Sequence, residues 1–196
     1  MPVADLPARH PAAWDRATRH PFLTAVRAGT VPVAAFDTWL AQDYRFVGDL
    51  LRFQARLLAR APRAAQAVLA GGAVALVDEL SWFEARAAER RLDLAAPPLP
   101  ATIRYAELLA RLDAADPPVA LAMLWTLERV YLDAWSGAAP GAPAYREFVA
   151  HWTMPEFASY VATLAEAADA APAGPVDALF LEVLDAEVAF WDMAST

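Results

Sequence analysis

The sequence predicts an all-α fold, a single-domain helical bundle of about seven to eight helices over residues 1–196. Three observations predict it. Prolines divide the chain into segments of helical length, and no segment has a convincing strand pattern. Hydrophobic residues make up 58% of the chain and alanine is the commonest, which favours closely packed helices. A chain of 196 residues fits one domain, which would bury roughly 70% of its unfolded surface.

Prolines also set the ends of the first expected helices. A broken helix is expected over about 11–28, interrupted near Pro21. A long helix follows over 32–61, because Pro32 suits the first turn of a helix and Pro62 ends it.

The rest of the chain is also expected to be helical. A third helix is expected over 63–91, where Gly71 and Gly72 would allow a bend. The run LAAPPLP at 94–100 is interpreted as an ordered crossing loop, because both of its flanks are strongly helical. The remaining helices are expected over about 101–114, 116–135, 144–153, 155–169 and from about 175 to the C-terminus.

Composition excludes several classes of function. The net charge is −8 and every basic residue is arginine, so the chain has no general attraction for nucleic acid and no lysine nucleophile. Cysteine is absent, which excludes disulfides, thiolate metal sites and a cysteine nucleophile. Neither a membrane-spanning apolar run nor a signal peptide is recognised, so no membrane association and a cytoplasmic location are expected.

Histidine is scarce and gives no metal-binding pattern. The three histidines, His10, His20 and His151, form neither an H-x-x-x-H nor an E-x-x-H pair. We find no phosphate-binding glycine loop and no nucleophile elbow around a serine. We therefore expect no metal and no cofactor, and we interpret His20 as a cap or turn residue before Pro21.

One acid stands on an otherwise apolar helical face. Phe36, Trp39, Leu40 and Asp43 follow the spacing of one face, and Phe46 extends it. An ionised carboxylate there must be paired or hydrogen-bonded, or must belong to a site that uses it.

Other acids and tyrosines also lie among aromatic residues, and each could simply be part of the core or of a surface ion pair. These are Glu79 and Glu84 beside Trp82 and Phe83, Tyr105, Glu128 with Tyr131, and Glu187 before Phe190 and Trp191. Two carboxylates and several aromatic rings facing one cavity would suit a flat, nitrogen-rich heterocycle. The rings would stack on it, and the acids would accept its amino hydrogens or move protons.

The segment HPFLTAVRAGTVPVAAFDTWLAQDYRFV at 20–47 resembles the opening of the TenA family of thiamin-salvage enzymes. The helix of Tyr105, the helix of Tyr131, HWTMPEFASYVATL at 151–164 and EVAFWDM at 187–193 follow in the family's order. The resemblance covers nearly the whole chain. It implies a heme-oxygenase-like bundle that forms a homo-oligomer, either a dimer or a tetramer. Trp135 and Tyr145 are expected to be exposed and to lie at such an interface.

The resemblance also implies roles for single residues. Asp43 matches the aspartate that holds the amino group and ring nitrogen of a pyrimidine. Tyr105 and Tyr131 match pocket tyrosines, and Glu187 matches a C-terminal acid proposed to move protons. Phe46 stands where the family has a further pocket tyrosine, so one hydroxyl is lost.

Two further departures affect the expected chemistry. Leu127 occupies the position of the family's cysteine nucleophile, and Trp152 stands where many members have a pocket tyrosine. The chain thus resembles the cysteine-less branch, in which a carboxylate takes over. Glu84 and Glu128 are the candidates. Glu128 is adjacent to Leu127 but points about 100° away from it on a helix, whereas Glu84 has the stronger aromatic setting and is slightly preferred.

The leading hypothesis is a hydrolase that acts on a small aromatic heterocycle. Its substrate would be 4-amino-5-aminomethyl-2-methylpyrimidine or the N-formyl derivative, without a cofactor. The first alternative is a non-catalytic protein that binds a pyrimidine. The second is an oxidative enzyme related to pyrroloquinoline quinone synthase or the heme oxygenases, which the scarcity of histidine and basic residues disfavours.

Overall fold

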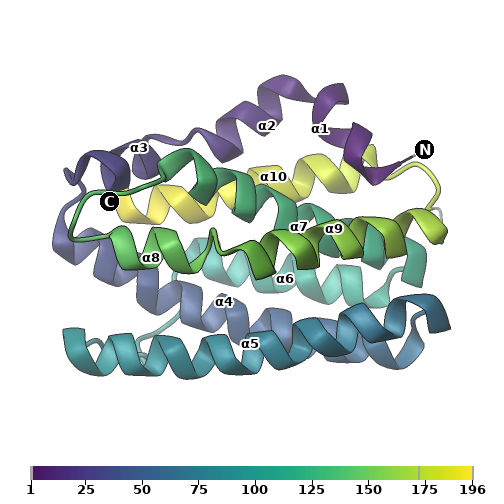
Figure 1. Ribbon diagram of the computed structural model, residues 1–196, viewed down its shortest axis with the longest axis horizontal. Helices are drawn as coiled ribbons and strands as arrows, with labels where there is room; N and C mark the ends of the chain where they lie inside the picture. Colours follow the sequence, from purple (N-terminus) through teal and green to yellow (C-terminus); the bar gives the residue numbers. More distant parts are fainter. Residues whose placement is uncertain (1, 172, 196) are drawn as a thin grey trace.

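The computed structural model describes residues 2–171 and 173–195, and these residues form an all-α single domain (Figure 1). Its helices are η1 (Val3–Asp5), α1 (Leu6–Arg9), α2 (Pro11–Thr18), α3 (Pro21–Ala28), α4 (Val33–Arg60), α5 (Arg63–Arg90), α6 (Pro100–Ala114), α7 (Pro117–Ala138), α8 (Arg146–His151), α9 (Pro155–Ala170), α10 (Asp177–Asp192) and η2 (Met193–Ser195). Eight of these described helices have eight or more residues, which confirms the expected number.

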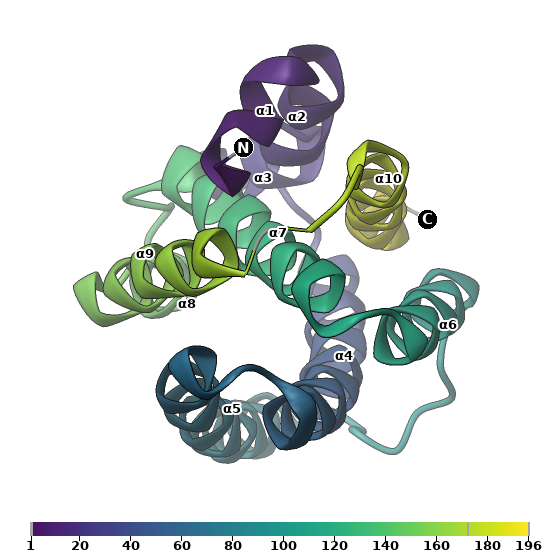
Figure 2. The ribbon, with the colours of Figure 1, turned by 90° about the vertical axis from the view of Figure 1, so that its right-hand side faces the viewer.

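The helix α7 occupies the centre of the bundle. Seen end on, it is surrounded by α4, α9, α10 and the short N-terminal helices (Figure 2). Every residue from Ala120 to Glu128 is buried, as expected for a helix that is apolar on nearly all sides. The two longest helices, α4 and α5, pack against each other, and α5 also contacts α9. The space that α4, α5, α7 and α9 surround contains the candidate site.

The expected interface aromatics prove to be core residues. Trp135 is 0% exposed, because α7 continues one turn beyond it to Ala138 and its ring packs 4.4 Å from that of Trp152. Tyr145 is 3% exposed and its hydroxyl donates a hydrogen bond to the Val31 carbonyl. The prediction that these two residues are exposed at a subunit interface is therefore wrong.

The helix α5 is continuous through its glycine pair, so the chain is not broken there. Gly72 is buried where α5 approaches α4 and α9. A Cβ atom added at Gly72 would overlap the side-chain amide of Gln54 and lie 2.7 Å from the ring of Tyr160. Gly71 faces open space, with nothing within 4 Å of such an atom. Close packing therefore explains Gly72.

The two glycines provide a matched pair of substitutions. We expect Gly72→Ala to lower the free energy of unfolding by about 1–3 kcal/mol, because the added methyl overpacks the contact. We expect Gly71→Ala to raise it by up to about 1 kcal/mol, since alanine favours an exposed helix interior. Urea unfolding followed by circular dichroism measures both. Equal effects of the two substitutions would contradict the packing explanation.

Among the described residues, α5 is the one helix whose length and composition would allow it to cross a membrane. A mostly buried core helix of a soluble protein can meet the same criterion, whereas only 22% of this stretch of α5 is buried. One face of α5 packs on α4 and α9 through residues such as Leu69 and Phe83, and the helix carries Glu79 to the central cavity. The expectation of no membrane association stays a prediction.

Candidate active site

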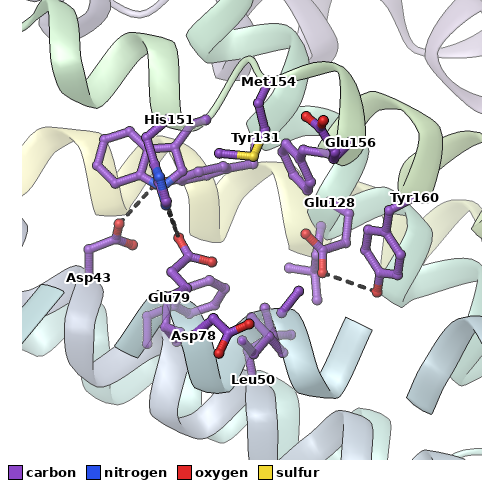
Figure 3. A pocket seen from close by; sticks show the side chains of 17 residues that line it. Asp43, Leu50, Asp78, Glu79, Glu128, Tyr131, His151, Met154, Glu156 and Tyr160 are labelled. Carbon is purple, nitrogen blue, oxygen red and sulfur yellow. Dashed lines mark hydrogen bonds and ion pairs between the residues drawn. The ribbon is translucent and has the colours of Figure 1, made fainter. Parts of the chain in front are cut away.

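A cavity of about 350 Å³ lies among α4, α5, α7 and α9, and is apolar over most of its wall (Figure 3). Its volume falls at the small end of ligand pockets, which span roughly 300–1,000 Å³. The residues that line it are Asp43, Phe46, Val47, Leu50, Ala75, Leu76, Asp78, Glu79, Leu127, Glu128, Tyr131, His151, Trp152, Met154, Glu156, Phe157 and Tyr160. Five of these side chains are acids, and no arginine or lysine is among them.

Asp43 is the acid on the apolar face of α4, and it is 1% exposed. Its Oδ2 accepts a hydrogen bond of 2.8 Å from the Tyr131 hydroxyl. Its Oδ1 is buried and has no hydrogen-bond partner among the described residues. Burial raises the pKa of Asp43 well above its usual value, against the opposing effect of the Tyr131 hydrogen bond. A buried oxygen without a partner is costly, so Oδ1 is suited to bind a ligand.

Glu79 enters the cavity from α5. It accepts a hydrogen bond of 2.8 Å from Trp152 Nε1, and its Oε1 lies 3.9 Å from His151 Nε2. Burial raises the pKa of Glu79 to about 7. The His151 ring stacks on Trp82 at 4.0 Å, and burial lowers the pKa of His151 to about 4. His151 is therefore neutral at neutral pH, and among the described residues that line the cavity no cation balances the acids.

Glu128 is a third buried acid in this cavity. It comes from α7, is 7% exposed and lies 3.5 Å from the Tyr160 hydroxyl. Burial, and secondarily the charge of Glu79, raise the pKa of Glu128 to about 8. Neighbouring residues of a helix point about 100° apart. Leu127 nevertheless lines the same cavity as Glu128, because the cavity covers a wide sector of α7. No set of three or more histidine or acidic side chains able to hold a metal ion occurs within residues 2–171 and 173–195.

Glu187 and Tyr105 form a separate buried pair beside the cavity. The Tyr105 hydroxyl donates a hydrogen bond of 2.8 Å to Glu187 Oε2, while Oε1 is buried without a partner among the described residues. Burial raises the pKa of Glu187 to about 7. The ring of Phe46, which lines the cavity, packs 4.5 Å from the ring of Tyr105. The pair therefore touches the wall of the cavity without lining it.

The preference for Glu84 as the extra acid needs correction. Glu84 is exposed and accepts a hydrogen bond of 3.0 Å from the Tyr44 hydroxyl, outside the cavity. It lies five residues after Glu79, which turns it by about 140° around α5. Of the two original candidates, only Glu128 faces the cavity.

Sequence reasoning placed some cavity residues and missed others. Of the residues expected to bind or act on a ligand, the cavity brings together Asp43, Phe46, Glu128, Tyr131 and Trp152. From the sequence, Glu79 was noted beside Trp82 but was not assigned to the site, although Glu79 lies three positions after Leu76 and four before Phe83, both buried, on the same face. Tyr160 and His151 gave no such signal, because they reach the cavity only through the packing of α8 and α9.

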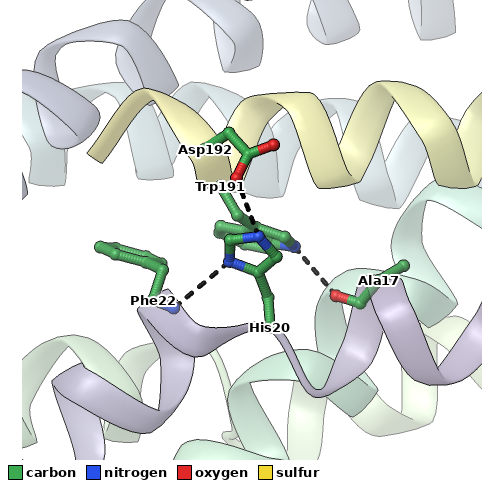
Figure 4. A network of polar contacts seen from close by, with 5 residues as sticks. All are labelled: Ala17, His20, Phe22, Trp191 and Asp192. Atoms are coloured by element: carbon green, nitrogen blue, oxygen red, sulfur yellow. Dashed lines mark hydrogen bonds and ion pairs between the residues drawn. The ribbon is translucent and has the colours of Figure 1, made fainter. Parts of the chain in front are cut away.

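His20, near the N-terminus, serves the structure. His20 caps α3, as predicted: its Nδ1 accepts a hydrogen bond of 3.2 Å from the Phe22 amide (Figure 4). Its Nε2 lies 3.2 Å from Asp192 at the end of α10. The preceding residue, Trp191, donates a hydrogen bond of 3.0 Å from its Nε1 to the Ala17 carbonyl. These contacts join the first helices to the last one.

Comparison with known proteins decides the family. The sequence pattern of the TENA/THI-4/PQQC family matches residues 8–196. The chain belongs to this family. A Glycine max member of the family, named "Probable bifunctional TENA-E protein", is 31% identical over 205 residues, which cover 95% of this chain and 90% of the soybean protein. The resemblance inferred from sequence motifs is thereby confirmed.

Solved structures of TenA homologues share the fold. The homologue from Pyrococcus furiosus has a TM-score of 0.91 at 28% identity, over 97% of this chain and 98% of its own. The homologue from Pyrococcus horikoshii has a TM-score of 0.89 at 20% identity, over 99% of this chain and 98% of its own, and shows the fold alone. The all-α TenA fold is thus established for nearly the whole chain.

Proposed function

We propose that the chain is a cofactor-independent hydrolase of 4-amino-5-aminomethyl-2-methylpyrimidine or its N-formyl derivative. The observation that carries the proposal is the unpartnered, buried Oδ1 of Asp43 at the wall of an apolar cavity. Membership of the TENA/THI-4/PQQC family supports a role related to thiamin.

Asp43 suits an aminopyrimidine because of its two oxygens. Its raised pKa allows the carboxyl to carry a proton. It can then donate a hydrogen bond to a ring nitrogen and accept one from the neighbouring amino group. Phe46, Tyr131 and Trp152 would contact the faces and edges of the ring.

Glu79 replaces Glu84 as our candidate for the general base. Its pKa of about 7 leaves it partly ionised at neutral pH, where a base can take a proton from water. The water oxygen bonds to the exocyclic carbon, the carbon–nitrogen bond breaks, and the nitrogen leaves as ammonia with an added proton. Glu187 stays our candidate for supplying that proton, because its pKa of about 7 leaves it partly protonated beside the cavity.

Asp43→Ala tests the proposal. We expect the aminopyrimidine to raise the melting temperature of the wild type, and we expect Asp43→Ala to lose both this shift and ammonia release. Asp49→Ala is the matched control, because Asp49 forms a surface ion pair with Arg52 and should change neither. Wild-type protein that releases neither ammonia from the aminopyrimidine nor formate from its N-formyl derivative would contradict the proposal. In Glu187→Gln, unchanged turnover would remove Glu187 from the mechanism.

A second candidate function is binding without turnover. Leu127, at the position where the family has its cysteine, lines the cavity and offers no nucleophile, which favours this reading. Ligand-dependent stabilisation without product would support it. The oxidative alternative fits the cavity less well, because no arginine or lysine is among the residues that line it, so none would pair with a polyanionic quinone precursor.

A further inference from the structure

Two polar regions lie toward opposite sides of the cavity. Asp43 lies on one side, and Tyr160 with Glu128 on the other, with apolar side chains such as Leu50 between them (Figure 3). A ligand whose ring is bound at Asp43 could therefore extend a side arm toward Tyr160.

The position of the Tyr160 hydroxyl is fixed by three other helices. It lies 3.2 Å from Gln54 Oε1 on α4 and 3.5 Å from Glu128 Oε1 on α7. Gln54 is 0% exposed and is anchored by a hydrogen bond of 2.9 Å from its Nε2 to the Leu69 carbonyl. Gly72 on α5 leaves the space that lets Tyr160 approach. The Tyr160 hydroxyl is therefore held in place by the packing of the bundle, unlike a mobile side chain on the surface.

The hydroxyl keeps hydrogen-bonding capacity for a ligand. Its distances of 3.2 and 3.5 Å to Gln54 and Glu128 exceed the roughly 2.5–3.0 Å of a well-formed O–H···O bond. Its proton can therefore turn to a better acceptor in the cavity. Burial raises the pKa of Glu128 to about 8, so this neighbour is also mostly protonated at neutral pH. Two O–H donors would then meet at this end, and a carbonyl oxygen is the natural partner for them.

We propose that Tyr160 and Glu128 form an acyl subsite, which binds the carbonyl oxygen of an N-acylated aminomethylpyrimidine while Asp43 holds the ring. This inference rests on the proposed function and deepens it by assigning the N-formyl derivative to a distinct end of the cavity. In the reaction, a water oxygen bonds to the formyl carbon and negative charge develops on the carbonyl oxygen. Tyr160 and Glu128 stabilise that charge. The carbon–nitrogen bond then breaks, the nitrogen takes the proton that the attacking water gave to the general base Glu79, and formate and the free amine leave.

Tyr160→Phe tests the subsite, because it removes the hydroxyl and keeps the ring. The quantity to measure is the ratio of kcat/KM for the N-formyl derivative to kcat/KM for the free amine. We expect Tyr160→Phe to lower this ratio about 10- to 100-fold. Tyr44→Phe is the matched control: it removes a tyrosine hydroxyl bonded to a glutamate, Glu84, outside the cavity, and should leave the ratio unchanged. Glu128→Leu is a second variant, and its ratio should also fall.

Each outcome bears on the subsite. A ratio within twofold of wild type in both Tyr160→Phe and Glu128→Leu, or an equal fall in Tyr44→Phe, would overturn it. If the wild type hydrolyses neither compound, the proposed function fails and the subsite is judged by binding. Calorimetry should then show that Tyr160→Phe weakens binding of the N-formyl compound about tenfold more than binding of the free amine. Equal weakening, or no binding of either compound to the wild type, would reject the subsite as well.

Discussion

Glu79→Gln is expected to lower turnover of the aminopyrimidine at least about 100-fold while making the protein more stable at pH 8. Turnover falls because glutamine cannot take a proton from water. Stability rises because the carboxylate is buried with a pKa of about 7, so ionising it at pH 8 costs free energy. Glutamine keeps the oxygen that accepts the Trp152 hydrogen bond, so that contact is preserved.

The gain in stability from Glu79→Gln follows from the rise in the pKa of Glu79 from 4.5 to about 7. Each unit by which the pKa is raised corresponds to about 1.4 kcal/mol above that pKa. Because the Glu79 side chain is 21% exposed, we expect a gain of about 1–3 kcal/mol rather than the full amount. For a protein of this size, that raises the melting temperature by roughly 3–10 °C. Single-turnover kinetics and thermal unfolding at pH 8 measure the two effects.

Glu84→Gln is the matched control on the same helix. Glu84 is exposed and lies outside the cavity, so we expect no change in turnover and a change in melting temperature within about 1 °C. Loss of turnover in Glu84→Gln, with Glu79→Gln still active, would refute the assignment and restore the original preference for Glu84.

The fold was largely predictable because prolines mark the helix starts. Pro21, Pro100, Pro117 and Pro155 each begin a helix, and Pro62 separates α4 from α5. Such signals depend only on the local backbone, so a single sequence shows them. Helix ends without a proline were predicted less accurately. The end of α7 was expected near Trp135, but the helix ends at Ala138.

Site residues were predictable only where the spacing of apolar residues along a single helix showed which side chains are buried. Asp43 stands on an apolar stripe of α4, so its burial followed from spacing alone. The choice between Glu79 and Glu84 required the rotation of α5 about its axis, which packing against α4 and α9 sets. Tyr160 joins the cavity through contacts between helices, and single-sequence periodicity contains no information about such contacts. Trp135 was misplaced for the same reason, since its partners come from α4, α10 and the segment after α8.

Stability is expected to fall as the pH rises from about 6.5 to 8.5. Glu79 and Glu187 have pKa values of about 7 and Glu128 of about 8, all raised by burial from the unfolded value of 4.5. Between pH 4.5 and 8 the folded protein therefore holds more protons than the unfolded chain, and stability decreases with pH. The pKa of His151, lowered to about 4 by burial, has the opposite effect only below about 6.5. The change in stability above pH 6.5 therefore reports the ionisation of these three acids.

Over this window we expect a loss of about 2–4 kcal/mol in the free energy of unfolding, measured by urea titration at several pH values. Glu128→Gln should show a clearly smaller loss, because Glu128 has the highest of the three pKa values and releases its proton within the window. Glu84→Gln should keep the full wild-type loss, since that carboxylate is exposed. Stability that stays constant or rises between pH 6.5 and 8.5 would mean that the acids of the cavity ionise freely. They would then be solvated in the folded protein, and the general base and the acyl subsite would both lose their physical basis.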